Sequence, residues 1–193
     1  MAVRADLRGW KAIRNAIVRT EKRVKVGILN DSQHESEDGD EDGISMLELA
    51  AIHEFGVDLP DREVKLPSGE TAVYPAMHIP ERSFIRATIN GKRDEVNAAI
   101  EEIVGIEVKK LLEIERVSEA QADAAAQRAL GRLGTKIVSM IRATIRNKQT
   151  VGPEDQANKP STIAKKGSST PLVDTGQLIN AVTYAVIDGK DDE

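Results

Sequence analysis

The sequence predicts an α+β protein in which a small antiparallel sheet packs against a long helix, with additional amphipathic helices and extended loops. Apolar residues recur every three or four positions in several long segments, as they do along one face of a helix. Shorter stretches lean toward β-structure, and one of them alternates polar and apolar residues as a half-buried strand does. Aromatic residues make up only 3% of the 193-residue chain, so Leu, Ile, Val and Ala must fill the core. A chain of this length predicts a single domain over residues 1–193.

The first predicted elements are a helix, a strand and a loop. Residues 4–20 predict an amphipathic helix, and its apolar stripe consists of Val3, Leu7, Trp10, Ile13 and Ile17. The stretch "RVKVGILN" alternates, which predicts a strand with Val24, Val26 and Ile28 on one face. Residues 31–43 hold seven carboxylates and no Lys or Arg, so they are too polar to bury and predict a loop.

The middle of the chain predicts two helices with a hairpin between them. The first helix ends near Gly56, which is expected to be its left-handed C-terminal cap, and its apolar face would consist of Ile44, Leu47, Ala51, Ile52 and Phe55. Two β-leaning stretches flank Pro67, Ser68 and Gly69 and predict the hairpin. Pro80 fits the first turn of the second helix, whose apolar stripe continues to Leu111.

The last third predicts a long helix, an arm, a short helix and a strand. Ser118 and Gln121 have the spacing of a capping box, and the segment that follows is helical to Asn147. Its alanines, with Gly131 and Gly134, would let another helix approach closely. Residues 148–171 are dense in Gly, Pro, Ser and Thr, which predicts an extended arm. Asp174 and Gln177 form an acidic capping box for a short helix, and "VTYAVID" predicts the closing strand.

Charge is segregated between neighbouring segments, although the net charge is only −5. Residues 1–29 carry eight Lys or Arg side chains against Asp6 and Glu21, whereas residues 31–43 are acidic throughout. A basic first helix also suits a DNA-binding module, which is an alternative function from a different class. No aromatic stacking residues or recognition motif accompany it, so a solvated outer face is favoured.

Composition excludes several classes of protein. The chain has no cysteine, which excludes disulfides, thiolate nucleophiles and Cys-ligated zinc and is typical of a reducing cytoplasm. No window approaches the roughly 18 apolar residues that a membrane-spanning helix needs. The sequence therefore predicts a soluble intracellular product with no membrane partner.

Two stretches resemble metal or catalytic motifs, and both fall short. Asp38, Asp40, Asp42 and Gly43 match the first half of an EF-hand loop, but Leu49 stands where its bidentate glutamate belongs. The His53-Glu54 pair lacks the second histidine of a zincin. Nucleophile and phosphate-loop motifs are absent too, so we expect no enzyme activity, no cofactor and no metal site. A metal-dependent hydrolase that uses His53, Glu54 and the acidic loop is the rival hypothesis.

Three pieces of the chain, in this order, resemble a known family: "LAAIHEFG", "IPERSFIRATI" and "STIAKKGSSTPLVDTGQLINAVTY". Together they are similar to the tail-component family of long-tailed bacteriophages, whose members are neck or tail-completion proteins at the head-to-tail junction. The resemblance spans about residues 24 to 187 and implies a structural α+β protein without catalytic residues. The matching residues are His53, Glu54, Phe55, Gly56, Pro80, Arg82, Phe84, Leu172, Asp174, Thr175, Gly176 and Leu178. The acidic insertion and the long alanine-rich helix depart from the plainer members.

The resemblance also implies partners and a location. It implies a homo-oligomeric ring, six-fold where it meets the tail tube, that joins the tail to the head or, alternatively, terminates the tail tube. Neck or connector proteins and the tail tube protein would be neighbours, and viral DNA would pass through the ring without specific binding. The protein would belong to the virion and be assembled in the cytoplasm of the bacterial host.

Each matched motif also has a structural interpretation. Phe55 and Phe84 are the expected apolar anchors of an aromatic-poor chain, and Arg82 could pair with Glu54 or with a neighbouring subunit. The arm at 148–171 would become ordered on a neighbour, because ordering costs about 1–2 kcal/mol per residue and needs buried contacts in return. The acidic loop at 31–43 would face either the DNA channel or solvent.

Overall fold

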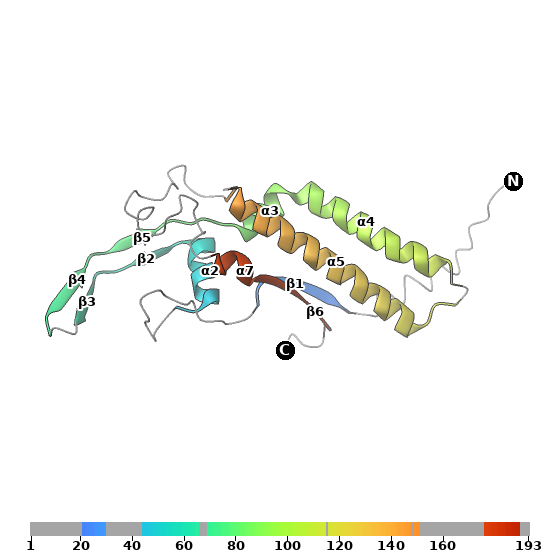
Figure 1. Cartoon of the computed structure of the whole chain (residues 1–193), viewed down its shortest axis with the longest axis horizontal. Coiled ribbons are helices and arrows are strands. Elements are labelled where there is room, and N and C mark those ends of the chain that lie inside the picture. The colour runs from blue at the N-terminus through green and yellow to red at the C-terminus, as the bar shows by residue number, and fades with distance from the viewer. Residues whose placement is uncertain are drawn as a thin grey trace. The chain divides into compact units, whose positions relative to one another are not determined.

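The computed structural model describes residues 21–29, 44–65, 69–114, 116–147, 149–150 and 176–189 (Figure 1). Helices and small antiparallel sheets combine with one long helix packed against strands, so the α+β prediction is confirmed. Contacts divide the chain into two compact units, and the boundary falls inside the longest helix, α5 (Glu119–Arg146). The single domain over residues 1–193 stays a prediction.

The first unit contains a two-stranded sheet. Strand β1 (Arg23–Ile28) pairs antiparallel with β6 (Val182–Ile187), and Val26 lies opposite Tyr184. The alternation predicted for β1 is confirmed, because Val24 and Val26 are more buried than Arg23 and Lys25. The strand predicted at the end of the sequence is confirmed as β6.

A helical hairpin of α4 (Arg93–Leu112) and the first part of α5 completes this unit (Figure 1). The predicted capping box at the start of α5 is confirmed: the Gln121 backbone N–H donates to Ser118 Oγ at 3.3 Å, and the Ser118 N–H donates to Gln121 Oε1 at 2.9 Å. Leu111 of α4 and Ala125 of α5 are buried together. The alanines of α5 therefore do admit a second helix at close range.

The two glycines of α5 are contacted by a strand, which corrects the prediction that they would face another helix. A side chain at Gly134 would lie only 2.5 Å from Cγ of Tyr184 on β6, and one at Gly131 would lie 3.8 Å from the Tyr184 hydroxyl. The absence of a side chain at Gly134 therefore lets the aromatic ring of β6 lie directly on α5.

The second unit contains α2 (Met46–Phe55), α3 (Ile85–Gly91), the end of α5 and α7 (Gln177–Ala181). Helix α2 packs against α7, and Arg142 of α5 donates a hydrogen bond to the Asn180 carbonyl at 3.3 Å. The buried hydroxyls of Thr88 and Thr144 are 2.8 Å apart and join α3 to α5. These contacts assemble four helical segments that are distant in sequence.

Three predictions about these helices are wrong. The buried face of α2 consists of Met46, Ala50 and Glu54, whereas Leu47 and Phe55 are exposed. Helix α3 begins at Ile85, so Pro80 lies in the extended segment before it and not in its first turn. The structure also divides the predicted helix in two, because α3 ends at Gly91 and α4 starts at Arg93.

A long antiparallel hairpin, here called the ribbon, consists of residues 57–65 and 69–79 (Figure 1). Its outer half pairs β3 (Arg62–Lys65) with β4 (Thr71–Tyr74), which confirms the predicted hairpin. Its inner half, β2 (Val57–Leu59) with β5 (Met77–Ile79), was not predicted. The register does not shift between the halves, and Pro60 and Pro75 occupy the interruption because proline cannot donate to the ladder.

Several predicted segments lie outside the described residues. They are the helix at 4–20, the acidic loop at 31–43, and the arm at 148–171 except residues 149–150.

Candidate functional site

The side chain of Glu54 joins two helices of the second unit, α2 and α3. It projects from the last turn of α2 and is only 5% exposed. A buried carboxylate costs several kcal/mol unless hydrogen-bond donors surround it. The donors found around Glu54 all belong to residues 83–86, at the start of α3.

Five N–H or O–H groups donate to this one carboxylate. Glu54 Oε1 accepts from Ser83 Oγ at 2.8 Å, from the Arg86 backbone N–H at 2.9 Å and from Arg86 Nε at 3.2 Å. Glu54 Oε2 accepts from the backbone N–H groups of Phe84 at 2.9 Å and Ile85 at 3.0 Å. Three of the five donors are backbone N–H groups at the start of a helix, which have no acceptor within the helix itself. Glu54 therefore acts as the N-terminal cap of α3, supplied from a different helix.

These hydrogen bonds stabilise the ionised form of Glu54. Burial raises the pKa of Glu54, but hydrogen bonds from the backbone N–H groups of Arg86, Ile85 and Phe84 and from the Ser83 hydroxyl outweigh it, so the pKa lies below its ordinary value. The site is thus built for a permanent carboxylate. A general acid or base needs the opposite, a pKa moved toward the working pH.

Arg86 connects Glu54 to two further residues. Its Nη2 donates to the Glu54 carbonyl and, at 2.9 Å, to Glu81 Oε1. Its guanidinium also lies 4.8 Å from the centre of the Phe55 ring. Phe55 is 66% exposed, so the prediction that it anchors the core is wrong, whereas Phe84, at 0%, confirms the same prediction.

Gly56 allows the chain to pass close to the segment before α3. A side chain at Gly56 would lie 2.9 Å from the Glu81 backbone nitrogen and 3.0 Å from the Ile79 carbonyl oxygen. Its φ of 72° needs glycine, but its ψ of 170° is not that of a left-handed cap, so this detail of the prediction is wrong. Beside it, the Arg82 backbone N–H donates to the His53 carbonyl at 2.7 Å.

The structure therefore brings two of the three matched pieces together. His53, Glu54 and Gly56 meet the segment that contains Pro80, Arg82 and Phe84 through the contacts just described. Arg86, which the sequence analysis did not single out, forms an ion pair with the Glu54 side chain. From the third piece, Gly176 precedes α7 and Leu178 is buried in it, while Leu172, Asp174 and Thr175 lie outside the described residues.

Two other stabilising features were missed by sequence reasoning. The Glu48 N–H donates to Ser45 Oγ at 3.1 Å and the Ser45 N–H donates to Glu48 Oε2 at 3.0 Å, a capping box whose S-x-x-E spacing was visible in the sequence. Glu107 of α4 is buried and contacts Lys110, Arg128 and Arg132 at 2.9, 2.9 and 3.2 Å. The sequence did not predict this cluster, because the position of Glu107 within an apolar stripe does not indicate which cations will contact it.

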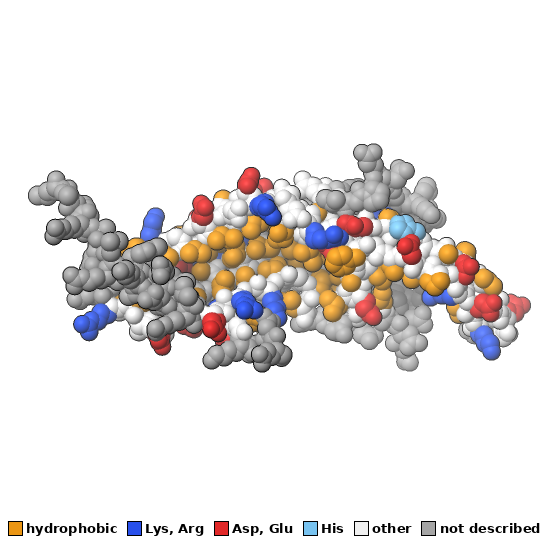
Figure 2. All heavy atoms as spheres, turned by 180° about the vertical axis from the view of Figure 1, so that it is seen from behind, with side chains coloured by type: hydrophobic (Ala, Val, Ile, Leu, Met, Phe, Trp, Pro, Cys, Tyr) orange, Lys and Arg blue, Asp and Glu red, His pale blue; other side chains and the backbone are white. Residues whose placement is uncertain are grey.

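The outer half of the ribbon is largely exposed. All four residues of β3 are exposed, as are three of the four in β4. The exposed large apolar side chains are Val64 on β3, Val73 and Tyr74 on β4, and Met77 on β5. Cross-strand pairs stiffen it: Arg62 lies 5.2 Å from the Tyr74 ring centre, and His78 Nδ1 lies 2.6 Å from Asp58 Oδ1. A two-stranded hairpin is at best marginally stable in water, so this one is suited to being covered by other protein. Figure 2 shows apolar and charged side chains interleaved along it.

Comparisons with protein-family models, curated proteins and solved structures return no match for this chain. Within the described ranges, no three His, Asp or Glu side chains are grouped as a metal site would require. Nor does any helix in that part of the chain have the length and apolar character needed to cross a bilayer.

Proposed function

We propose that this protein is a structural virion component of a tailed bacteriophage, forming a ring at the head-to-tail junction that completes the tail and joins it to the head. The proposal rests on the resemblance of three pieces of the chain to the tail-component family. It is supported by the physical role of the first two pieces, whose contacts hold α2 and α3 together.

The observation that carries the proposal is the junction at Glu54. The pieces "LAAIHEFG" and "IPERSFIRATI" are 23 residues apart in the sequence, yet a buried carboxylate in one caps the helix of the other. Residues matched for a structural reason are expected to make such contacts, and residues matched for catalysis would converge on an open cleft.

The ribbon supports an oligomer. Both faces of its outer half are exposed, and among the described residues each of its strands pairs with one other strand, so both strands are sheet edges. A second copy that covers these edges and the apolar side chains would stabilise a conformation that is marginal alone. The ring is therefore assembled through the ribbon.

Imaging of phage particles made without the protein tests the proposal. Finished heads and tails that remain unjoined are the expected result. Tails of uncontrolled length would instead support the alternative of a tail terminator. Normal infectious particles in the absence of the protein would refute both.

A further inference from the structure

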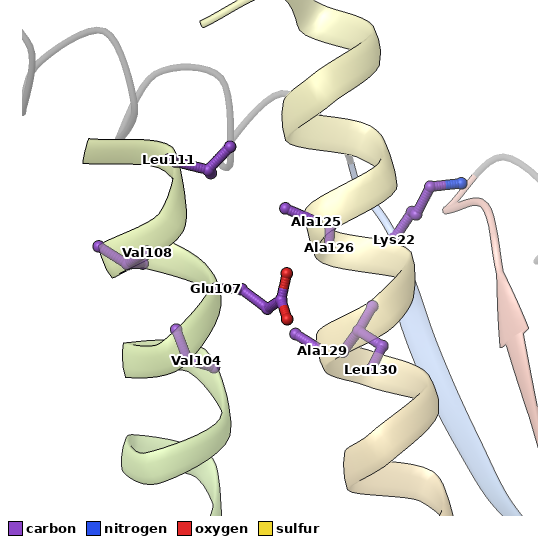
Figure 3. A pocket seen from close by; sticks show the side chains of 9 residues that line it. All are labelled: Lys22, Val104, Glu107, Val108, Leu111, Ala125, Ala126, Ala129 and Leu130. Atoms are coloured by element: carbon purple, nitrogen blue, oxygen red, sulfur yellow. The ribbon is translucent and has the colours of Figure 1, made fainter. Parts of the chain in front are cut away.

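An open apolar groove runs across the helical hairpin of the first unit. Its volume is about 160 Å³, and apolar side chains of α4 and α5 line most of it. Figure 3 shows Ala125 and Ala129 directed from α5 toward α4, and Lys22 on the other side of α5. Figure 2 shows apolar side chains gathered over this pair of helices. The lining residues are Lys22, Val104, Glu107, Val108, Leu111, Ala125, Ala126, Ala129 and Leu130.

The polar groups in the groove are already satisfied. Glu107, 2% exposed, is the carboxylate in its lining, and Lys110, Arg128 and Arg132 all contact it. Lys22 contacts Asp188 at 2.6 Å and Asp123 at 3.3 Å. An occupant therefore needs no charge of its own at the floor of the groove, and it must be apolar to bury Val104, Val108 and Leu130.

We propose that residues 4–20 of the same chain occupy this groove. Lys22 lines it, so the chain reaches the groove immediately after that segment ends. The segment has the apolar stripe that the groove requires, and it is tethered there at an effective concentration on the order of millimolar. An untethered partner would have to compete with that concentration.

Length and charge agree with this assignment. A 17-residue helix is about 25 Å long, which equals the distance along α4 from Leu111 back to Asp94. The first half of the segment is basic, with Arg4, Arg8 and Lys11, and the first half of α4 is acidic and exposed at Asp94, Glu95, Glu101 and Glu102. Filling the groove from within the chain leaves the ribbon as the surface for other copies.

The fluorescence of Trp10 tests the proposal, because it is the single tryptophan of the chain and lies in the apolar stripe. In the full-length protein, its emission should be shifted to shorter wavelength and its quenching by acrylamide should be severalfold weaker than in urea. Val104→Asp, which places a charge in the groove, should restore most of the quenching. The matched control is Ile106→Asp: it lies on the same helix outside the groove lining, and the two positions are 40% and 39% exposed.

Each alternative result overturns the proposal. Trp10 quenched as strongly in the native protein as in urea would show that the segment is not buried. Equal effects of Val104→Asp and Ile106→Asp would place it elsewhere. Quenching that increases on dilution would assign the groove to the segment of a second copy. Circular dichroism of both variants confirms that α4 and α5 remain folded.

Discussion

At the scale of single residues, Glu54 shows how a carboxylate can be committed to structure. Because Glu54 follows a histidine, the sequence raised the hypothesis of a metal or catalytic site. Its two oxygens instead accept hydrogen bonds from Ser83, Phe84, Ile85 and Arg86. Hydrogen bonds to a charged group contribute about 1.5–3 kcal/mol each, and leaving buried N–H groups unpaired costs a similar amount. The residue therefore decides whether α2 and α3 stay together.

Glu54→Gln should lower the free energy of unfolding by about 2 kcal/mol, because the amide keeps one acceptor oxygen and places a donor against backbone N–H groups. Urea unfolding followed by circular dichroism measures it. Glu81→Gln is the control: it removes the other carboxylate on Arg86, at the surface, and should change stability by no more than about 0.5 kcal/mol. Equal effects would mean that the Glu54 cap is not the stabilising feature.

Acid should destabilise the protein through two carboxylates. Burial raises the pKa of Glu107 as it does that of Glu54, but hydrogen bonds from Lys110 and Arg128 and the charges of these cations outweigh burial and hold the pKa below its ordinary value. Such groups contribute stability that is present above the unfolded-chain pKa and is lost as pH falls through the folded pKa. The urea midpoint should therefore decline below about pH 4.5, and less steeply in Glu54→Gln. A midpoint that rises on acidification would contradict this.

Residue roles were predictable only where one factor decided them. Phe84 is buried because an aromatic-poor core needs it, and Gly56 is glycine because its φ is positive. Phe55 has the same apolar character, but its position on α2 is set by Glu54, which must turn inward to reach its donors. A buried charge with donors from another element leaves no periodic signal in the sequence.

At the scale of elements, some patterns set by neighbouring residues predicted the structure correctly, whereas contacts between distant elements could not be predicted. The capping box at Ser118, the alternation of β1 and the hairpin around Gly69 each follow from neighbouring residues, and all three are present. The start of α3 could not be predicted from Pro80, because its cap comes from Glu54. The sequence likewise did not predict which strands pair: β1 pairs with β6, and β2 pairs with β5 in the inner half of the ribbon.

Two glycines in helix interiors should respond in opposite ways to alanine. Nothing lies within 4 Å of a side chain added at Gly105 of α4, so Gly105→Ala should stabilise the protein by about 0.5–1 kcal/mol through helix propensity. Gly134→Ala should destabilise it by about 1–3 kcal/mol, because the Tyr184 ring must move away. Thermal unfolding of both variants measures the difference. Stabilisation by both would show that β6 does not lie on α5 at Gly134.

At the scale of the whole molecule, the proposed assembly depends on exposed apolar side chains. Among the described residues, the accessible large apolar side chains include Val73, Tyr74 and Met77 of the ribbon and Leu47 and Phe55 of α2. In the outer half of the ribbon, Val73 and Tyr74 lie on opposite faces. Val73 shares one face with Glu63 and Lys65, and Tyr74 shares the other face with Arg62. In the proposed ring, neighbouring copies would cover this surface on both sides.

The mass of the purified protein, measured by native mass spectrometry at increasing concentration, tests the assembly most directly. We predict the mass of a closed ring, with the six copies that the family resemblance implies. Val73→Asp should give the mass of a monomer instead. Leu112→Asp is the control: it places the same charge at an exposed apolar position at the end of α4, where Leu112 is 51% exposed against 66% for Val73, and it should leave the ring intact. A protein that stays monomeric at every concentration, or a ring that survives Val73→Asp unchanged, would contradict assembly through the ribbon.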